Sequence, residues 1–307
     1  MNPKSEEART RDDRPFIGMT IADAANLSAL EGRSSCPKCG KSRMYFCYTC
    51  YVPVEQIKEY IPKCSLPVKV DIIKHRREID GKSTAAHAAV LAPLDVNIYI
   101  YPDFPKYELN DRTVLLYPGV DASSVQHLFT GRKNSVSYSE HLLAELPPGY
   151  NVGTLMKKTV DSPSTFEIHH VNELPIDRVV LIDSTWNQSR GIFADERLQN
   201  MPKIVLQNRA SQFWRHQRGS PRWYLSTIEA LHQLMLELHI SAWGLSEQYS
   251  SELTRHYPVH KSGEVHSHCK PYSGEYDNLL YFFKFIYEKL HTLYKHEDML
   301  AYKRPML

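Results

Sequence analysis

Residues 178–186 read RVVLIDSTW, and this stretch decides the fold. Arg178 to Asp183 (RVVLID) form a continuous apolar and β-branched run, which is typical of a strand buried on both faces of a parallel sheet. The run ends in an acidic residue followed by Ser184, Thr185 and Trp186. Because open α/β sheets bind ligands beyond the carboxyl ends of their strands, we predict a functional site at this point.

Strand and helix patterns alternate on both sides of this stretch. Further strands are predicted from β-branched or apolar runs at residues 68–74, 97–101, 113–117 and 204–206. Helical patterns occur at 83–91 and 276–294, and Ser226 and Glu229 are spaced as a capping box that begins a helix over 226–240. This alternation predicts an α/β fold with a mostly parallel sheet.

The composition is that of a soluble globular protein. Hydrophobic residues make up 42% and charged residues 23%, so neither disorder nor a fibrous class is indicated. No apolar run approaches the ~18 residues that cross a bilayer, and the charged start differs from a signal peptide. We therefore expect a protein of the nucleus and/or cytosol, with no membrane partner and no obligate protein partner. The net charge of +2 means that any RNA contact must come from local patches.

Four of the six cysteines form two close pairs, Cys36-x2-Cys39 and Cys47-x2-Cys50. This is the ligand pattern of a structural Zn²⁺ site, and a reducing compartment argues against disulfides. We predict a zinc-ribbon-like module over residues 35–66. Its basic and aromatic side chains either grip RNA and stack on unpaired bases, or simply pack as part of a structural staple. They are Lys38, Lys41, Arg43, Tyr45, Phe46, Tyr48 and Tyr51.

The tetrapeptide Gly81-Lys82-Ser83-Thr84 looks like the end of a phosphate-binding loop, because it lies between a predicted strand and a predicted helix. A phosphate-binding loop needs another glycine five residues before Gly81, and this chain has Arg76 there. We therefore interpret Ser83 as a helix cap.

Together, the cysteine pairs, the Asp-x-Thr-Trp signature at 183–186 and the block LSTIEA at 225–230 identify a family. Over about residues 34–295 the chain resembles the DTW-domain tRNA-uridine aminocarboxypropyltransferases, in particular their eukaryotic branch. The resemblance implies a SPOUT-like sheet with a C-terminal knot that binds S-adenosylmethionine. Periodicity alone favours an unknotted sheet, because knots are nearly absent among proteins.

The polar start, the cysteine pairs and the resemblance together predict three regions. Residues 1–34 are expected to be a mobile N-terminal tail, 35–66 the zinc-binding module and 67–307 the DTW catalytic domain. Irregular composition predicts insertions in that domain near 120–175 and 254–274.

The implied reaction moves the 3-amino-3-carboxypropyl group of S-adenosylmethionine to N3 of a uridine in tRNA and releases 5'-methylthioadenosine. A loop uridine is expected, because bases stacked in an A-form helix hide their pairing edges. Two alternatives stay open. One is an S-adenosylmethionine-dependent RNA methyltransferase on the same scaffold, and the other is a non-catalytic RNA-binding adaptor.

The resemblance assigns roles to individual residues. Asp183, with Thr185 and Trp186, forms the catalytic signature; Asp183 is the candidate general base for the uridine N3 proton, or else orders the loop or holds the cofactor. The cofactor pocket is implied to contain Tyr117, Pro118, Gly119, Ser184, Leu225, Ser226, Thr227 and Glu229, and free N–H groups at the helix start suit a carboxylate. RNA phosphates are expected at Arg209, Arg215, Arg218 and Arg222, with Lys74, Arg76 and Arg77 as further members of the track.

Overall fold

The centre of the protein is a parallel sheet. The computed structural model describes residues 14–108, 110, 112–119, 121–130, 166–207, 209–217, 219–251, 253–254, 257–260 and 270–304. Its strands are β5 (Lys69–Lys74), β6 (Val96–Ile100), β7 (Thr113–Leu116), β8 (Ser123–Ser124), β9 (Arg178–Asp183) and β10 (Lys203–Val205). They form one six-stranded sheet in the order β6-β5-β9-β7-β10-β8, with every pair parallel. The predicted α/β class is confirmed.

Strand β9 lies inside the sheet, between β5 and β7. Val179 faces one apolar cluster and Val180 faces the other, and neither is exposed to solvent. Burial on both faces is the physical reason why this strand reads as an uninterrupted apolar run.

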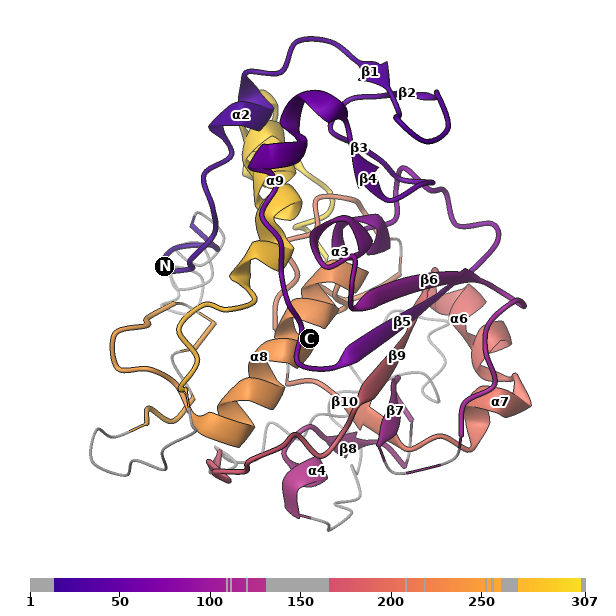
Figure 1. The fold of residues 1–307 in the computed structure, drawn as a ribbon, viewed down its shortest axis with the longest axis vertical. Helices are drawn as coiled ribbons and strands as arrows, with labels where there is room; N and C mark the ends of the chain where they lie inside the picture. Colours follow the sequence, from indigo (N-terminus) through magenta and orange to yellow (C-terminus); the bar gives the residue numbers. More distant parts are fainter. Residues whose placement is uncertain are drawn as a thin grey trace.

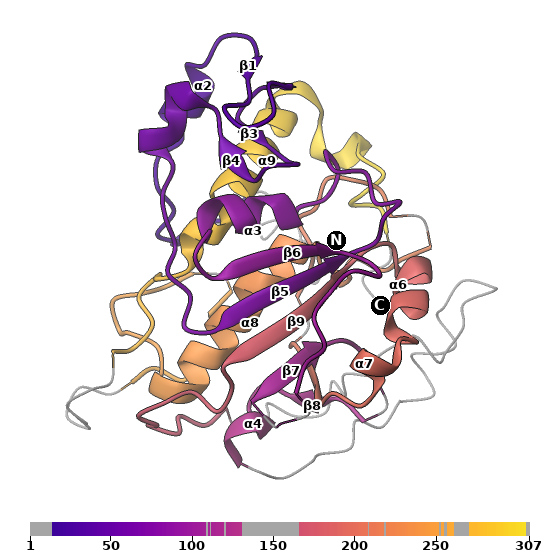
Figure 2. The same ribbon diagram turned by 45° about the vertical axis from the view of Figure 1, so that its right-hand side comes forward.

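Helices cover both faces of the sheet (Figures 1 and 2). Helices α3 (Ala85–Leu91) and α8 (Thr227–Trp243) pack on one face, while α6 (Trp186–Phe193) and α7 (Glu196–Gln199) pack on the other. The predicted capping box at the start of α8 is present, with Ser226 as N-cap and Glu229 as its partner.

A small module with the cysteine pairs sits beside α9 (Tyr281–Leu293), at the top of Figure 1. It consists of two antiparallel pairs and a 3-10 helix: β1 (Ser34–Ser35) with β2 (Ser42–Arg43), β3 (Phe46–Cys47) with β4 (Val52–Pro53), and η1 (Glu55–Tyr60). Two further 3-10 helices flank α9, η3 (Asp277–Leu280) and η4 (His296–Asp298).

The described part of the expected tail is packed against the C-terminal helices. Phe16 is only 7% exposed and meets the rings of Phe283 and Tyr287 edge to face at 6.2 and 5.3 Å. Leu27, in the short helix α2 (Ala25–Ser28), is 1% exposed. Phe16 and Leu27 thus anchor this segment to the folded body, Phe16 through helix α9. Residues 1–13 lie outside the described part of the chain.

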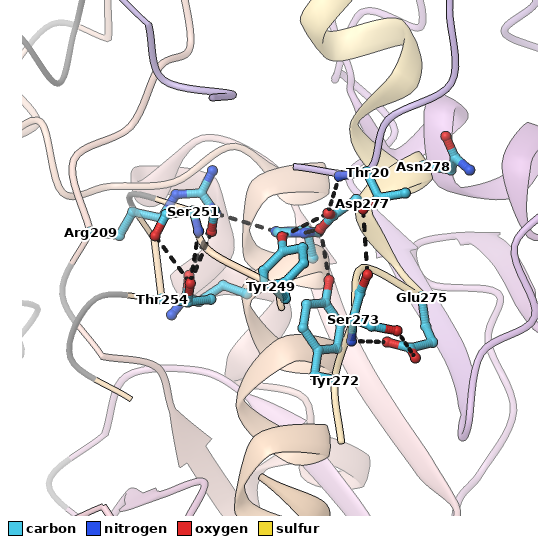
Figure 3. Close-up of polar contacts among 12 residues, drawn as sticks. Thr20, Arg209, Tyr249, Ser251, Thr254, Tyr272, Ser273, Glu275, Asp277 and Asn278 are labelled. Carbon is cyan, nitrogen blue, oxygen red and sulfur yellow. Dashed lines mark hydrogen bonds and ion pairs between the residues drawn. The ribbon is translucent and has the colours of Figure 1, made fainter. Parts of the chain in front are cut away.

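A buried carboxylate ties this segment to the rest of the fold (Figure 3). Asp277 is fully buried, and its Oδ2 accepts hydrogen bonds from the backbone N–H of Thr20 and the hydroxyl of Tyr249, both at 2.7 Å. Its Oδ1 accepts from the hydroxyl of Tyr272 at 2.7 Å and from His232 Nε2 at 3.0 Å. Burial alone would raise the pKa of Asp277, but these donors hold that pKa below its ordinary value.

The two predicted insertions fall largely outside the described residues, which exclude 131–165 and 261–269. The start of the first insertion is part of the sheet, since it contains the edge strand β8 and the short helix α4 (His127–Thr130). Within the described chain, no helix is both long and apolar enough to span a membrane.

Candidate active site

A pocket of about 900 Å³ opens at the carboxyl ends of the central strands. Strand β5 leads through α3 to β6 on one side of the sheet, and its neighbour β9 leads through α6 and α7 to β10 on the other. The loops that follow β5 and β9 therefore diverge, which leaves a crevice between them. Both loops line the pocket, together with the segments after β7 and β10 and the start of α8. A pocket therefore lies at the strand ends where the sequence predicts a functional site.

Asp183 joins three of these segments. The hydroxyl of Thr227, at the start of α8, donates to Asp183 Oδ1 at 2.5 Å. The hydroxyl of Ser83, in the β5–α3 loop, donates to Asp183 Oδ2 at 2.7 Å. Each carboxylate oxygen thus holds one neighbouring segment, so Asp183 fixes how the β5–α3 loop, the end of β9 and the start of α8 meet.

Electrostatics of Asp183 reflect its burial. Asp183 is only 5% exposed, and this burial raises the pKa of its carboxyl group above the ordinary value for an aspartate. The hydroxyls of Thr227 and Ser83 and the positive charge of Lys74 oppose this rise. Lys74 is paired with Asp183 in the register of β5 and β9, and its ammonium forms an ion pair with Asp80.

The residues that follow Asp183 in the signature have distinct structural roles. Thr185 is the N-cap of α6 and forms a capping box with Gln188, whose side chain accepts from the Thr185 N–H at 3.3 Å. Trp186 begins α6, and its ring lies 4.2 Å from that of Tyr224. Ser184, Thr185 and Trp186 all line the pocket. Thus the acid ends the strand, the threonine starts the helix, and the tryptophan forms part of the pocket wall.

The start of α8 is more completely hydrogen-bonded than expected. The N–H and the hydroxyl of Ser226 both donate to Glu229 Oε2, at 2.9 and 2.7 Å, and the N–H of Ile228 donates to Thr84 Oγ1 at 3.2 Å. Glu229 is fully buried, does not line the pocket and also holds the 211–212 segment through Ser211 and Gln212. A direct cofactor contact by Glu229 is therefore wrong, and these N–H groups are not free for a carboxylate.

The other residues assigned to the cofactor divide in the same way. Tyr117, Pro118, Leu225, Ser226 and Thr227 line the pocket. Gly119 does not line it; a Cβ atom there would lie 2.9 Å from Asp121 Oδ1 and 3.1 Å from Lys203 Cδ, so a larger residue would require these two side chains to shift.

Only one described arginine of the predicted RNA set lines the pocket. Arg215 does so, and donates weakly to the carbonyl of Gly81 at 3.3 Å. Arg222 is 3% exposed and donates to the carbonyl of Ser211, so its assignment to RNA is wrong. Arg209 points inward to His232 and Gln233 and is also withdrawn from the RNA set. Arg218 lies outside the described residues.

Sequence reasoning missed several pocket residues. Glu78 and Lys82, in the β5–α3 loop, line the pocket. Ser83 accepts a hydrogen bond from the N–H of Ala85 near the start of α3, as expected, but its hydroxyl also donates to Asp183. Trp223 and Tyr224 add aromatic walls. The sequence Gly81-Lys82-Ser83-Thr84, although it is not a phosphate-binding loop, could have indicated these residues, because it lies in a strand-to-helix loop beside the site.

The four paired cysteines meet at one point. The Sγ atoms of Cys36, Cys39, Cys47 and Cys50 lie within 4.8 Å of one another. Tetrahedral ligation with metal–sulfur bonds of about 2.3 Å places sulfurs about 3.8 Å apart, and Cys39 and Cys47 are separated by 3.7 Å. The N–H of Lys38 donates to Cys36 Sγ at 3.4 Å, and the N–H of Cys50 donates to Cys47 Sγ at the same distance. The cluster can hold a metal ion and leaves no ligand position open.

Aromatic residues of this module pack against helix α9. Phe46 lies 4.6 Å from the ring of Phe282, and Tyr45 lies 5.1 Å from that of Phe285. Arg43 is buried; its guanidinium lies 3.9 Å from the Tyr48 ring and donates to Cys47 Sγ. The structural-staple interpretation accounts for these contacts.

The chain is thus an α/β protein with a pocket at the carboxyl ends of a parallel sheet, where an aspartate at the end of β9 joins the surrounding segments. A family model described as DTW domain matches residues 44–291. The chain belongs to the DTW domain family.

Relatives extend the match over nearly the whole chain. It is 40% identical to tRNA-uridine aminocarboxypropyltransferase 1 of Mus musculus over 292 residues, which are 92% of this chain and 86% of the mouse protein. The protein of the same name from Homo sapiens is 39% identical, with 93% and 86% covered, and that from Xenopus laevis is 38% identical, with 85% and 81% covered. No solved structure gives a significant match.

Proposed function

We propose that this protein is a tRNA-uridine aminocarboxypropyltransferase, which transfers the 3-amino-3-carboxypropyl group of S-adenosylmethionine to N3 of a loop uridine. The observation that carries the proposal is the similarity of 38–40% to proteins of that name over most of the chain. The pocket supports it independently, because a crevice at the carboxyl ends of a parallel sheet is the usual ligand site of such folds.

The size and lining of the pocket support S-adenosylmethionine as its ligand. Its volume of about 900 Å³ lies within the range of small-molecule sites. Aromatic walls from Trp186 and Tyr224 suit the flat adenine ring, and the segments at 116–118, 183–186 and 225–227 surround the cavity. We assign Tyr117, Pro118, Ser184, Leu225, Ser226 and Thr227 to donor binding, with Asp183, Thr185 and Trp186 as the catalytic signature.

The reaction is a displacement at carbon. The lone pair of uridine N3 forms a bond to the γ-carbon of the methionine portion, and the bond from that carbon to the sulfonium breaks. The electron pair stays on sulfur, so the donor leaves as neutral 5'-methylthioadenosine. The N3 proton must leave for this to happen, and the protein accelerates the step by accepting that proton and by aligning the γ-carbon with the base.

Cationic side chains at the pocket suit the phosphates that flank a loop uridine. Arg215 and Lys82 line the cavity, and Arg76 and Arg77 are exposed in the same β5–α3 loop as Lys82. We assign these groups to tRNA. Arg215, Arg76 and Arg77 were already predicted for this track, and Lys82 is added to it. Arg209 and Arg222 are removed, and so is Lys74, which is only 3% exposed.

We assign Zn²⁺ to the four-cysteine cluster as a structural ion, because four thiolates at tetrahedral spacing match its preferred ligands. The parallel sheet with its pocket at the strand ends supports a SPOUT-like arrangement. The C-terminal knot remains a prediction of the family resemblance.

Incubation of the purified protein with S-adenosylmethionine and unmodified tRNA tests the function. We expect 5'-methylthioadenosine and aminocarboxypropyl-uridine, detected by mass spectrometry. S-adenosylhomocysteine with a methylated base would identify a methyltransferase instead. Neither product with any tRNA pool, despite tRNA binding, would indicate an adaptor.

A further inference from the structure

The pocket contains a second carboxylate, Glu78, in the loop between β5 and α3. The residue is half-buried and lines the cavity. Its backbone N–H is bonded to the carbonyl of His75 at 2.8 Å, which holds the loop in a turn. Among the described residues, its side chain has neither a hydrogen bond nor an ion pair. No described residue therefore occupies the lone pairs of this carboxylate.

Asp183 is in the opposite state. Each of its oxygens accepts a short bond from a hydroxyl, Thr227 on Oδ1 and Ser83 on Oδ2, and the residue is 5% exposed. Movement of Asp183 towards a substrate would break the contacts that join three segments of the pocket wall. Its geometry fits an organiser of the site better than a group that exchanges protons with a bound base.

The surroundings of Glu78 strengthen it as a proton acceptor. Burial and the negative charge of Asp183 raise the pKa of Glu78, while Lys74, Lys82 and Arg215 oppose the rise. A carboxylate with a raised pKa holds a proton more strongly, so it is a better proton acceptor than an exposed one. The nearby cations also suit the phosphates of RNA.

We propose that Glu78 is the general base of the reaction and that Asp183 is a positioning residue. This assignment rests on the proposed function. The Glu78 carboxylate takes the proton from uridine N3, the N3 electron pair forms the bond to the γ-carbon, and the carbon–sulfur bond breaks with its electrons going to sulfur. The proton then passes from Glu78 to solvent at the open side of the pocket.

The test compares Glu78→Gln with Asp183→Asn, and Glu196→Gln, at an exposed position of α7, serves as a matched control. Product formation is measured under saturating tRNA and S-adenosylmethionine across pH, and donor affinity is measured by calorimetry. For Glu78→Gln we expect kcat to fall roughly 10²- to 10⁴-fold with unchanged donor affinity. The pH profile of kcat for this variant should lack the acidic limb of the wild type. The difference in kcat between variant and wild type should become smaller as pH rises, because uridine N3 then loses its proton without a base. Glu78→Asp restores part of kcat.

For Asp183→Asn we expect weaker donor binding and a lower melting temperature, because the clamp on Ser83 and Thr227 is disturbed. The assignment is overturned if Glu78→Gln keeps the wild-type kcat and acidic limb. It is equally overturned if Glu78→Gln loses donor affinity to the same degree as activity, since Glu78 would then be a binding residue. A wild-type protein that forms no aminocarboxypropyl-uridine would refute the proposed function itself, and the role of Glu78 with it.

Discussion

The hydrogen bond from Thr227 to Asp183 offers the sharpest test of how the site is built. Replacement of Thr227 by valine removes the hydroxyl but keeps the size and β-branching of the side chain. Valine and threonine also have similar helix propensities, so the first turn of α8 should form equally well. The variant therefore isolates one donor to a carboxylate that is 5% exposed.

Hydrogen bonds to charged groups contribute roughly 1.5–3 kcal/mol, so Thr227→Val should lower the free energy of unfolding by about 2 kcal/mol at neutral pH. Thr227→Ser keeps the hydroxyl and should lose much less. Urea denaturation, with the slope m unchanged, measures both values. If the valine and serine variants were equally stable, the Asp183 clamp would not contribute to stability, and our account of the site would be wrong.

The same pair of variants should show a defined pH dependence. The pKa of Asp183 in the folded protein is raised above 3.8, chiefly by burial, so its ionised form costs stability at neutral pH and this cost disappears as pH falls through the raised pKa. Thr227→Val raises that pKa further. A protonated carboxyl loses only a neutral hydrogen bond, about 0.5–1.5 kcal/mol. The difference between valine and wild type should therefore shrink by about 1 kcal/mol as pH is lowered towards 3.8.

Three further predictions concern other parts of the molecule. Cys39→Ser should lower metal content and melting temperature because it removes one thiolate, whereas Cys64→Ser, outside the cluster, should retain the metal; elemental analysis distinguishes them. Arg215→Gln should weaken tRNA binding and reduce the slope of log K against log salt by about one, with unchanged donor affinity; an unchanged slope would exclude a phosphate contact. Tyr249→Phe removes one donor to buried Asp277 and should cost roughly 1.5–3 kcal/mol of unfolding free energy, while Tyr294→Phe, which is 59% exposed, should change it by less than about 0.5 kcal/mol.

Local sequence patterns determined where the main strands, helices and the cysteine cluster occur along the chain. The run RVVLID predicts β9, Ser226 and Glu229 predict the start of α8, and the cysteine pairs predict one cluster of thiolates. Each of these features depends on residues close together in the chain: burial on two faces, a cap within one turn, or two short knuckles. Together with Asp183 at a strand end, they were sufficient to locate the pocket.

Tertiary structure alone decided which side chains meet there. Ser83 lies 100 positions before Asp183 and Thr227 lies 44 after it, and they converge because β5 and β9 are neighbours in a sheet whose strand order differs from chain order. The local spacing of apolar residues contains no information about the order of the strands in the sheet. For the same reason, charge pattern could not show that Arg222 is buried or that Glu78 faces the cavity. Sequence specifies the segments and their ends, while packing over long separations specifies the chemistry between them.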